Sequence, residues 1–129
     1  MELFYCFANA SLTRRVSTYL KQRYRCCFND VTVLFLNDCW VMRLMVRPTA
    51  PTAQRRNSLA ILNENGVVYH PPLSLQAAFR ELHCGKSTTA VMKQYQVAIV
   101  FHGEPNPVEI THFQEQFVNG LGYRPQSLV

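Results

Sequence analysis

Basic side chains, which attract phosphates and carboxylates, concentrate in the first part of this chain. The first 57 residues hold nine Lys and Arg against three Asp and Glu, and the remainder holds four against five. Some of these cations recur on one face of an expected helix, and others follow in a polar stretch. The sequence predicts a small binding or regulatory module whose basic surface takes an anionic partner, either nucleic acid or an acidic protein. The predicted anion-binding residues are Arg14, Lys21, Arg25, Arg55 and Arg56.

A second set of side chains predicts a pocket. His70, Tyr95 and His102 each lie at the end of an expected strand, a common place for site residues. Their ring nitrogens and hydroxyl can hold a small ligand or transfer protons. No serine or cysteine stands in a nucleophile signature. The alternative function is therefore a small-molecule-binding protein or an enzyme, with a pocket between sheet and helices.

Two further motifs fail on spacing. Gly85-Lys86-Ser87-Thr88 looks like the end of a phosphate-binding loop, but Arg80 stands where that loop needs another glycine. His83 and Cys84 are adjacent, so on a helix their side chains point about 100° apart, and no second ligand pair accompanies them. We expect no metal and no cofactor, and we interpret Gly85 as the end of a helix followed by a polar connector.

The cysteines predict reduced thiols. Their number is odd and no Cys-x-x-Cys pair occurs, which does not suit a disulfide framework. The N-terminus also lacks a basic flank followed by an apolar stretch, so we expect no secretory signal and a cytoplasmic protein. Cys6 and Cys39 fall in apolar strands, where we expect small core side chains. The five cysteines are Cys6, Cys26, Cys27, Cys39 and Cys84.

The candidate site residues must be positioned by strands and helices, and the strongest pattern for such an element predicts a hairpin over residues 31–46. Two apolar runs flank Asn37-Asp38, a pair that accepts the positive φ of a tight turn. In the resulting register one face is wholly apolar, and the other carries Thr32 and Arg43 at the end away from the turn. We expect helices to bury the apolar face, which consists of Val31, Val33, Phe35, Trp40, Met42 and Leu44.

The remaining elements follow from periodicity and turn residues. Residues 2–8 predict a strand, and residues 9–24 predict an amphipathic helix capped by Asn9 or Ser11. Residues 47–57 hold two prolines and predict a long loop. Asn65-Gly66 predicts a second hairpin, formed by residues 59–62 and 67–70. The rest is expected as a helix at 74–85, a short helix or crossover at 86–94, a strand at 95–102 and a helix after Asn106 that buries Ile110, Phe113, Phe117 and Leu121.

The predicted fold is a single α+β domain over residues 1–129, with a mainly antiparallel sheet and helices packed on one face. Without the second hairpin and the last helix, the element order is β-α-β-β-α-β, as in ferredoxin-like domains. A sheet this apolar often needs further covering, so we expect a homo-oligomer. No apolar run reaches the length of a membrane span, so we expect no membrane association.

Overall fold

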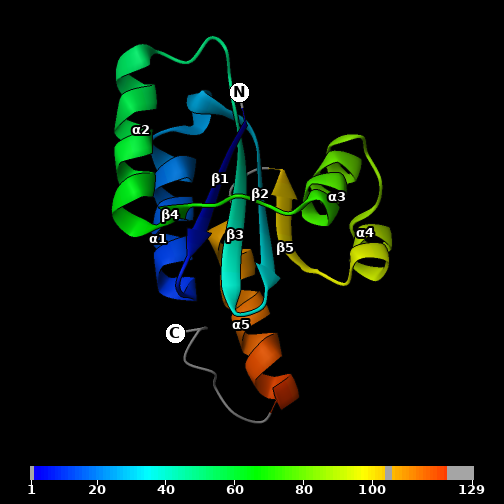
Figure 1. The fold of residues 1–129 in the computed structure, drawn as a ribbon. Coiled ribbons are helices and arrows are strands. Elements are labelled where there is room, and N and C mark those ends of the chain that lie inside the picture. Colours follow the sequence, from blue (N-terminus) through cyan, green and yellow to red (C-terminus); the bar gives the residue numbers. More distant parts are fainter. Residues whose placement is uncertain (1, 104–105, 122–129) are drawn as a thin grey trace.

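A computed structural model of the chain describes residues 2–103 and 106–121, with side chains as far as residue 115. The predicted α+β class is confirmed (Figure 1). The elements in chain order are β1 (Glu2–Phe7), α1 (Ala10–Gln22), a short 3-10 helix η1 (Arg25–Cys27), β2 (Phe28–Leu36), β3 (Cys39–Val46), α2 (Thr52–Asn65), β4 (Val67–Val68), α3 (Leu73–His83), α4 (Thr88–Tyr95), β5 (Ala98–Gly103) and α5 (Pro107–Leu121).

The predicted central hairpin is confirmed residue by residue. Asn37 and Asp38 have φ values of 51° and 60°, the left-handed conformation that a two-residue turn requires. Every expected pair forms, from Leu36 opposite Cys39 at the turn to Val31 opposite Leu44. The five-stranded sheet has the order β4-β1-β3-β2-β5, and all of its neighbouring strands run antiparallel.

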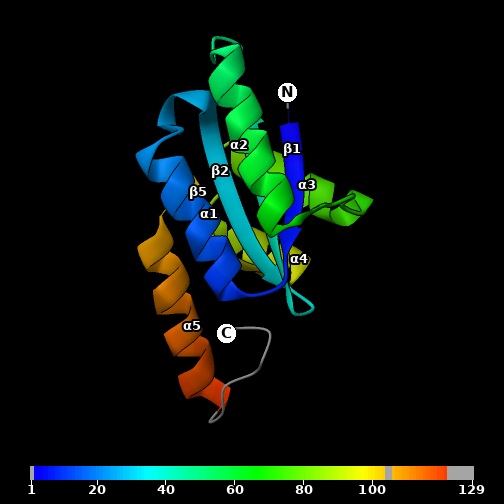
Figure 2. The same cartoon turned by 90° about the vertical axis from the view of Figure 1, so that its left-hand side faces the viewer.

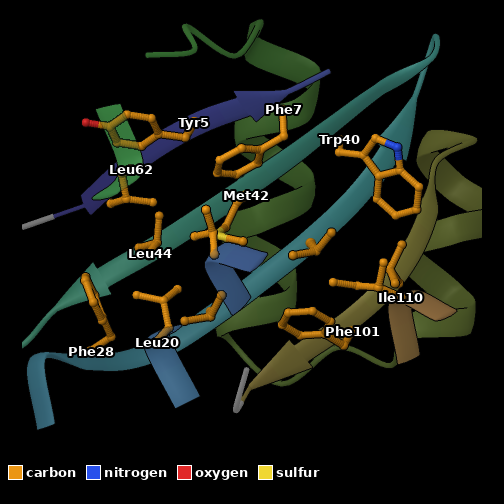
Figure 3. Packing of buried hydrophobic residues seen from close by; sticks show 14 of the residues in the cluster. Tyr5, Phe7, Leu20, Phe28, Trp40, Met42, Leu44, Leu62, Phe101 and Ile110 are labelled. Atoms are coloured by element: carbon orange, nitrogen blue, oxygen red, sulfur yellow. The ribbon is translucent and has the colours of Figure 1, made fainter. Parts of the chain in front are cut away.

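The apolar face of the hairpin forms the main core, as predicted. Trp40, Met42 and Leu44 are completely buried there. α1, α2 and α5 cover this face, and Leu20, Leu62 and Ile110 point from those helices toward the strands (Figure 3). Figure 2 looks onto α1 and α2 with the sheet behind them. Asn9 caps α1 as expected, because its side-chain oxygen accepts a hydrogen bond from the backbone N–H of Leu12.

The expectation of helices on one face only is wrong. α3 and α4 lie on the opposite side of the sheet from α1 and α2 (Figure 1). Leu34 and Val41, which project to that side, are buried against Leu75 and Phe79 of α3. Alternation along the hairpin supplies a second apolar face, so a second helical layer is needed. The chain covers both faces of its own sheet, which removes the reason for expecting an oligomer.

The predicted loop at 47–57 and the second hairpin are also wrong, because α2 occupies residues 52–65. Only Ser58 and Leu62 of this helix are buried, so its apolar stripe is narrow. The sequence therefore shows only a weak helical repeat of apolar residues in this segment. Asn65-Gly66 ends the helix instead of forming a turn, and the Gly66 amide bonds to the carbonyl of Leu62. The expected strand after it shrinks to the two residues of β4, which pair with Tyr5 and Cys6 of β1.

The predicted ferredoxin-like order is not confirmed. It took the helix from Ser74 and the strand from Tyr95 as its last two elements. That helix is α3, with Leu75, Ala78, Phe79 and Leu82 buried as expected. The strand is β5, which begins only at Ala98 and pairs with β2 at one edge of the sheet. α5 starts at Pro107 and buries Ile110 as predicted, whereas the side chains of Phe117 and Leu121 lie outside the described residues.

A disulfide joins Cys6 of β1 to Cys39 of β3, so the expectation that both are reduced is wrong. The register places Cys6 opposite Val41. Cys39 therefore lies diagonally across on the same face, with a Cα–Cα distance of 6.4 Å that a disulfide can span. Disulfides persist mainly in oxidising compartments, so this bond gives the expected cytoplasmic location no support. Within residues 2–103 and 106–121, no helix has the length and apolarity needed to span a membrane.

Candidate functional site

The predicted basic residues lie in one layer of the molecule, formed by α1, η1 and α2 on one face of the sheet. We call residues 10–29 and 47–63 the cationic layer. These two segments contain eight of the thirteen Lys and Arg and no Asp or Glu. α1 and α2 pack against each other, so the two segments form one surface. Such a concentration of one sign of charge produces a field that attracts anions.

Contacts around η1 join the two segments at one end of the layer. The Cys26 thiol donates to the Oε1 atom of Gln54 in the first turn of α2, with an S···O distance of 2.9 Å. The backbone N–H of Arg47 donates to the carbonyl of Cys27 at 2.7 Å, and its Nε donates to the carbonyl of Phe28 at 3.0 Å. The last turn of α1 and the first turn of α2 lie at the same end in both views (Figures 1 and 2).

The five predicted anion-binding residues differ in how they are held. Lys21, Arg25 and Arg56 are exposed. Arg55 is partly buried and donates to the carbonyl of Ala50 at 3.0 Å. Arg14 lies partly buried between α1 and α5, where its guanidinium donates to Gln114 at 3.1 Å and to Thr111 at 3.4 Å. Lys21, Arg25, Arg55 and Arg56 therefore belong to the end built around η1, whereas Arg14 ties two helices together.

The opposite face of the sheet carries a row of side chains that crosses four strands. Phe4 of β1 pairs with Arg43 of β3, Arg43 pairs with Thr32 of β2, and Thr32 pairs with His102 of β5. Paired residues project to the same face. Arg43 and Thr32 are buried there, so this row brings a charge and two polar groups beneath α3.

Arg43 is the most unusual member of the row, because only 3% of its side chain is exposed. Its Nε donates to Oε2 of Glu2, at 2.5 Å, while Glu2 itself is 42% exposed. The Nη1 atom of Arg43 is buried and has no hydrogen-bond partner within the described part of the chain. A guanidinium cannot lose its proton, so an unpaired buried nitrogen carries a desolvation cost.

A pocket of about 280 Å³ opens beside Arg43. The His83 ring on its wall lies 3.4 Å from a carboxylate oxygen of Asp30, and the half-exposed Glu2 stands at its rim. The wall therefore combines two guanidinium groups, an imidazole, a carboxylate, an amide and an aromatic ring. These are Glu2 and Phe4 of β1, Arg43 of β3, and Gln76, Arg80 and His83 of α3.

His102 of β5 is the last member of the row. Its Nδ1 lies 2.6 Å from the hydroxyl of Thr32. Burial, followed by the charges of Arg43 and His83, lowers the pKa of His102, while Asp30 and a hydrogen bond to the backbone of Leu82 oppose this shift. Thr32 is fully buried, so its hydroxyl orients the ring and cannot reach a substrate as a nucleophile.

The structure does not bring His70, Tyr95 and His102 together. His70 follows β4 at one edge of the sheet, and His102 lies on β5 at the other edge. Tyr95 ends α4 and hydrogen-bonds to Glu81, which raises the pKa of Tyr95. The Gly85-Lys86-Ser87 motif is a helix end and a connector, as interpreted from the sequence. Ser87 caps α4 by accepting from the N–H of Ala90.

Sequence reasoning missed the pocket residues. Arg43 was visible as the one charge within an apolar strand, and an apolar strand with a single arginine indicates a buried charge that must find partners. No such signal marked Glu2, Arg80 and His83. These residues are far from Arg43 in the sequence, and only the pairing of the strands and the packing of α3 bring them close to it.

Comparisons with known proteins relate this chain to others through its fold alone. No family model matches the sequence, and no curated protein matches it. The C-terminal domain of YpbH, known from its crystal structure, is similar, with a TM-score of 0.50 over 87% of this chain and 98% of that chain. The two share 15% sequence identity, so the similarity concerns the fold and assigns no activity.

Proposed function

We propose that this chain is a binding module whose cationic layer takes an anionic partner, either nucleic acid or an acidic protein. One observation carries the proposal: two segments with eight cations and no Asp or Glu pack side by side on one face of the sheet. Lys21, Arg25, Arg55 and Arg56 are the contact residues that we propose. Arg14 contributes to the field but is held by α5.

Binding through phosphate contacts should be weak, independent of base sequence and steeply reduced by salt. Fluorescence anisotropy with labelled single-stranded DNA of mixed sequence, and separately with labelled polyglutamate, tests it across a salt series. Lys21 and Arg56 are both exposed, so replacing them with glutamine should leave stability nearly unchanged. The plot of the logarithm of the association constant against the logarithm of the salt concentration has a negative slope, and this slope should become less steep by about 0.7 for each lost contact with single-stranded DNA.

A matched control removes two charges from the other side of the sheet. Lys86→Gln with Lys93→Gln changes the net charge by the same amount, on the connector to α4 and on α4 itself. Binding of DNA favours a nucleic-acid partner, and binding of polyglutamate alone favours an acidic protein. If neither probe binds the parent in low salt, or if both double variants weaken binding equally, the cationic layer is not the binding surface.

A further inference from the structure

We propose that the pocket beside Arg43 is a binding site for a carboxylate group. The site is independent of the proposed function, since it lies beneath α3 on the opposite face of the sheet from the cationic layer. Its central feature is the guanidinium of Arg43, which lines the pocket and belongs to a side chain that is only 3% exposed. One of its nitrogens, Nη1, has no hydrogen-bond partner among the described residues.

Arg43 needs an acceptor beyond Glu2. Glu2 accepts from Nε on one side of the guanidinium, which leaves Nη1 unpaired. A buried unsatisfied polar atom in a native protein calls for an explanation, and a missing ligand oxygen is one. Because the guanidinium is permanently charged, an anionic oxygen stabilises it more than a neutral one does.

The charges of the pocket favour a singly charged group. Arg43 and Arg80 contribute two positive charges and Glu2 contributes one negative charge, so these three side chains give the wall a net charge of +1. A planar carboxylate carries one negative charge and matches the flat fork of a guanidinium. A phosphate monoester carries more charge and would approach the carboxylate of Glu2, so it fits less well.

The remaining wall indicates an apolar group next to the carboxylate. The ring of Phe4 and the side chain of Pro71 line the pocket, and Gln76 is held in place by donating to the carbonyl of Pro71 at 3.0 Å. The volume of about 280 Å³ suits a compound of roughly the size of one aromatic acid. A free small acid and the C-terminal residue of a peptide both present this chemistry.

Titration calorimetry at low ionic strength tests the site with defined probes. Benzoate represents a free acid, N-acetylphenylalanine represents a peptide C-terminus, and N-acetylphenylalanine amide lacks the carboxylate. Saturable binding of either acid, without binding of the amide, supports the site and identifies the source of the carboxylate. Binding of inorganic phosphate alone, or of none of these probes, would overturn it.

Variants separate the pocket from general charge effects. Arg80→Gln should weaken binding several-fold, and Arg43→Met should weaken it by about tenfold or more. Glu2→Gln should strengthen binding, because it removes the competing carboxylate from Arg43. Lys93→Gln, an exposed cation of α4, is the control and should change nothing. If Arg43→Met does not fold, the opposite effects of Arg80→Gln and Glu2→Gln decide, and equal affinities of these two variants and the parent would refute the site.

Discussion

Replacing Gly66 by alanine should destabilise the protein for a steric reason. Gly66 follows α2 with φ −149° and ψ −173°, extended values that any residue adopts. A Cβ atom at this position would lie 2.7 Å from Cδ1 and from Cε1 of Phe7, and 2.8 Å from the carbonyl oxygen of Cys6. Phe7 is completely buried and the Cys6 carbonyl belongs to β1, so neither can move without disturbing the sheet.

Two effects of opposite sign set the magnitude. Alanine restricts the unfolded chain, which stabilises a protein by about 0.4–1 kcal/mol where the site accepts it. Overpacking of a close-packed interior costs about 1–3 kcal/mol. Because a contact of 2.7 Å cannot be accommodated in place, the second effect prevails, with a net loss of about 1–2 kcal/mol in the free energy of unfolding. The displaced segment should also loosen the pairing of β4 with β1.

Urea unfolding at an unchanged m-value measures this loss. Gly85→Ala is the matched control, because Gly85 has φ +96° and, apart from its chain neighbours, no described residue has a heavy atom within 4 Å of a Cβ there, so its cost is backbone strain alone. In a Phe7→Leu background the ring atoms are gone, so Gly66→Ala should cost less there, whereas Gly85→Ala should cost the same in both backgrounds. A Gly66→Ala protein as stable as the parent would refute the close packing of this segment on β1.

Three further predictions concern the core, the cysteines and pH. Trp40 is fully buried between Phe35 and Phe113, so Trp40→Ala should cost about 3–5 kcal/mol in urea unfolding; parent fluorescence typical of a water-exposed indole would contradict this. Intact-mass measurement without reductant should give a mass about two units below that of the reduced chain, because the Cys6–Cys39 bond removes two hydrogens; an unchanged mass would show both thiols free. The folded state lowers the pKa of His102 below its ordinary 6.5, so the stability that the neutral ring contributes is present above that value and is lost as pH falls through it. His102→Gln should therefore flatten the dependence of stability on pH below about pH 6.5, and an identical slope in parent and variant would exclude this role.

Local signals predicted the parts of the fold in which short-range pattern and tertiary packing agree. The hairpin register followed from Asn37-Asp38 and from the alternation around it, because the turn fixes which residues face each other. The position of α3 followed from Leu75, Phe79 and Gly85 in the same way. In both cases the buried residues repeat at the period of the element that holds them.

The errors arose where packing overrides the local pattern. Asn65-Gly66 is a strong turn signal, yet the preceding residues form α2, because Leu62 reaches the core and Gly66 is the residue that fits against Phe7. Likewise, the sequence shows that the two segments of the cationic layer lack Asp and Glu, but their adjacency follows only from the packing of α1 against α2 and from the contact between η1 and α2. The pocket depends on Arg43 and Arg80, which are 37 positions apart and are brought together only in the fold.

Chemical-shift mapping on the isotope-labelled protein tests the proposed function most directly. Titration with single-stranded DNA of mixed sequence at low salt should shift backbone amides of residues 21–27 and 52–56, at the end of the cationic layer built around η1. The same amides should return toward their free positions as salt is added. Shifts confined to α3 and α4, or scattered evenly over both faces of the sheet, would contradict binding by the cationic layer.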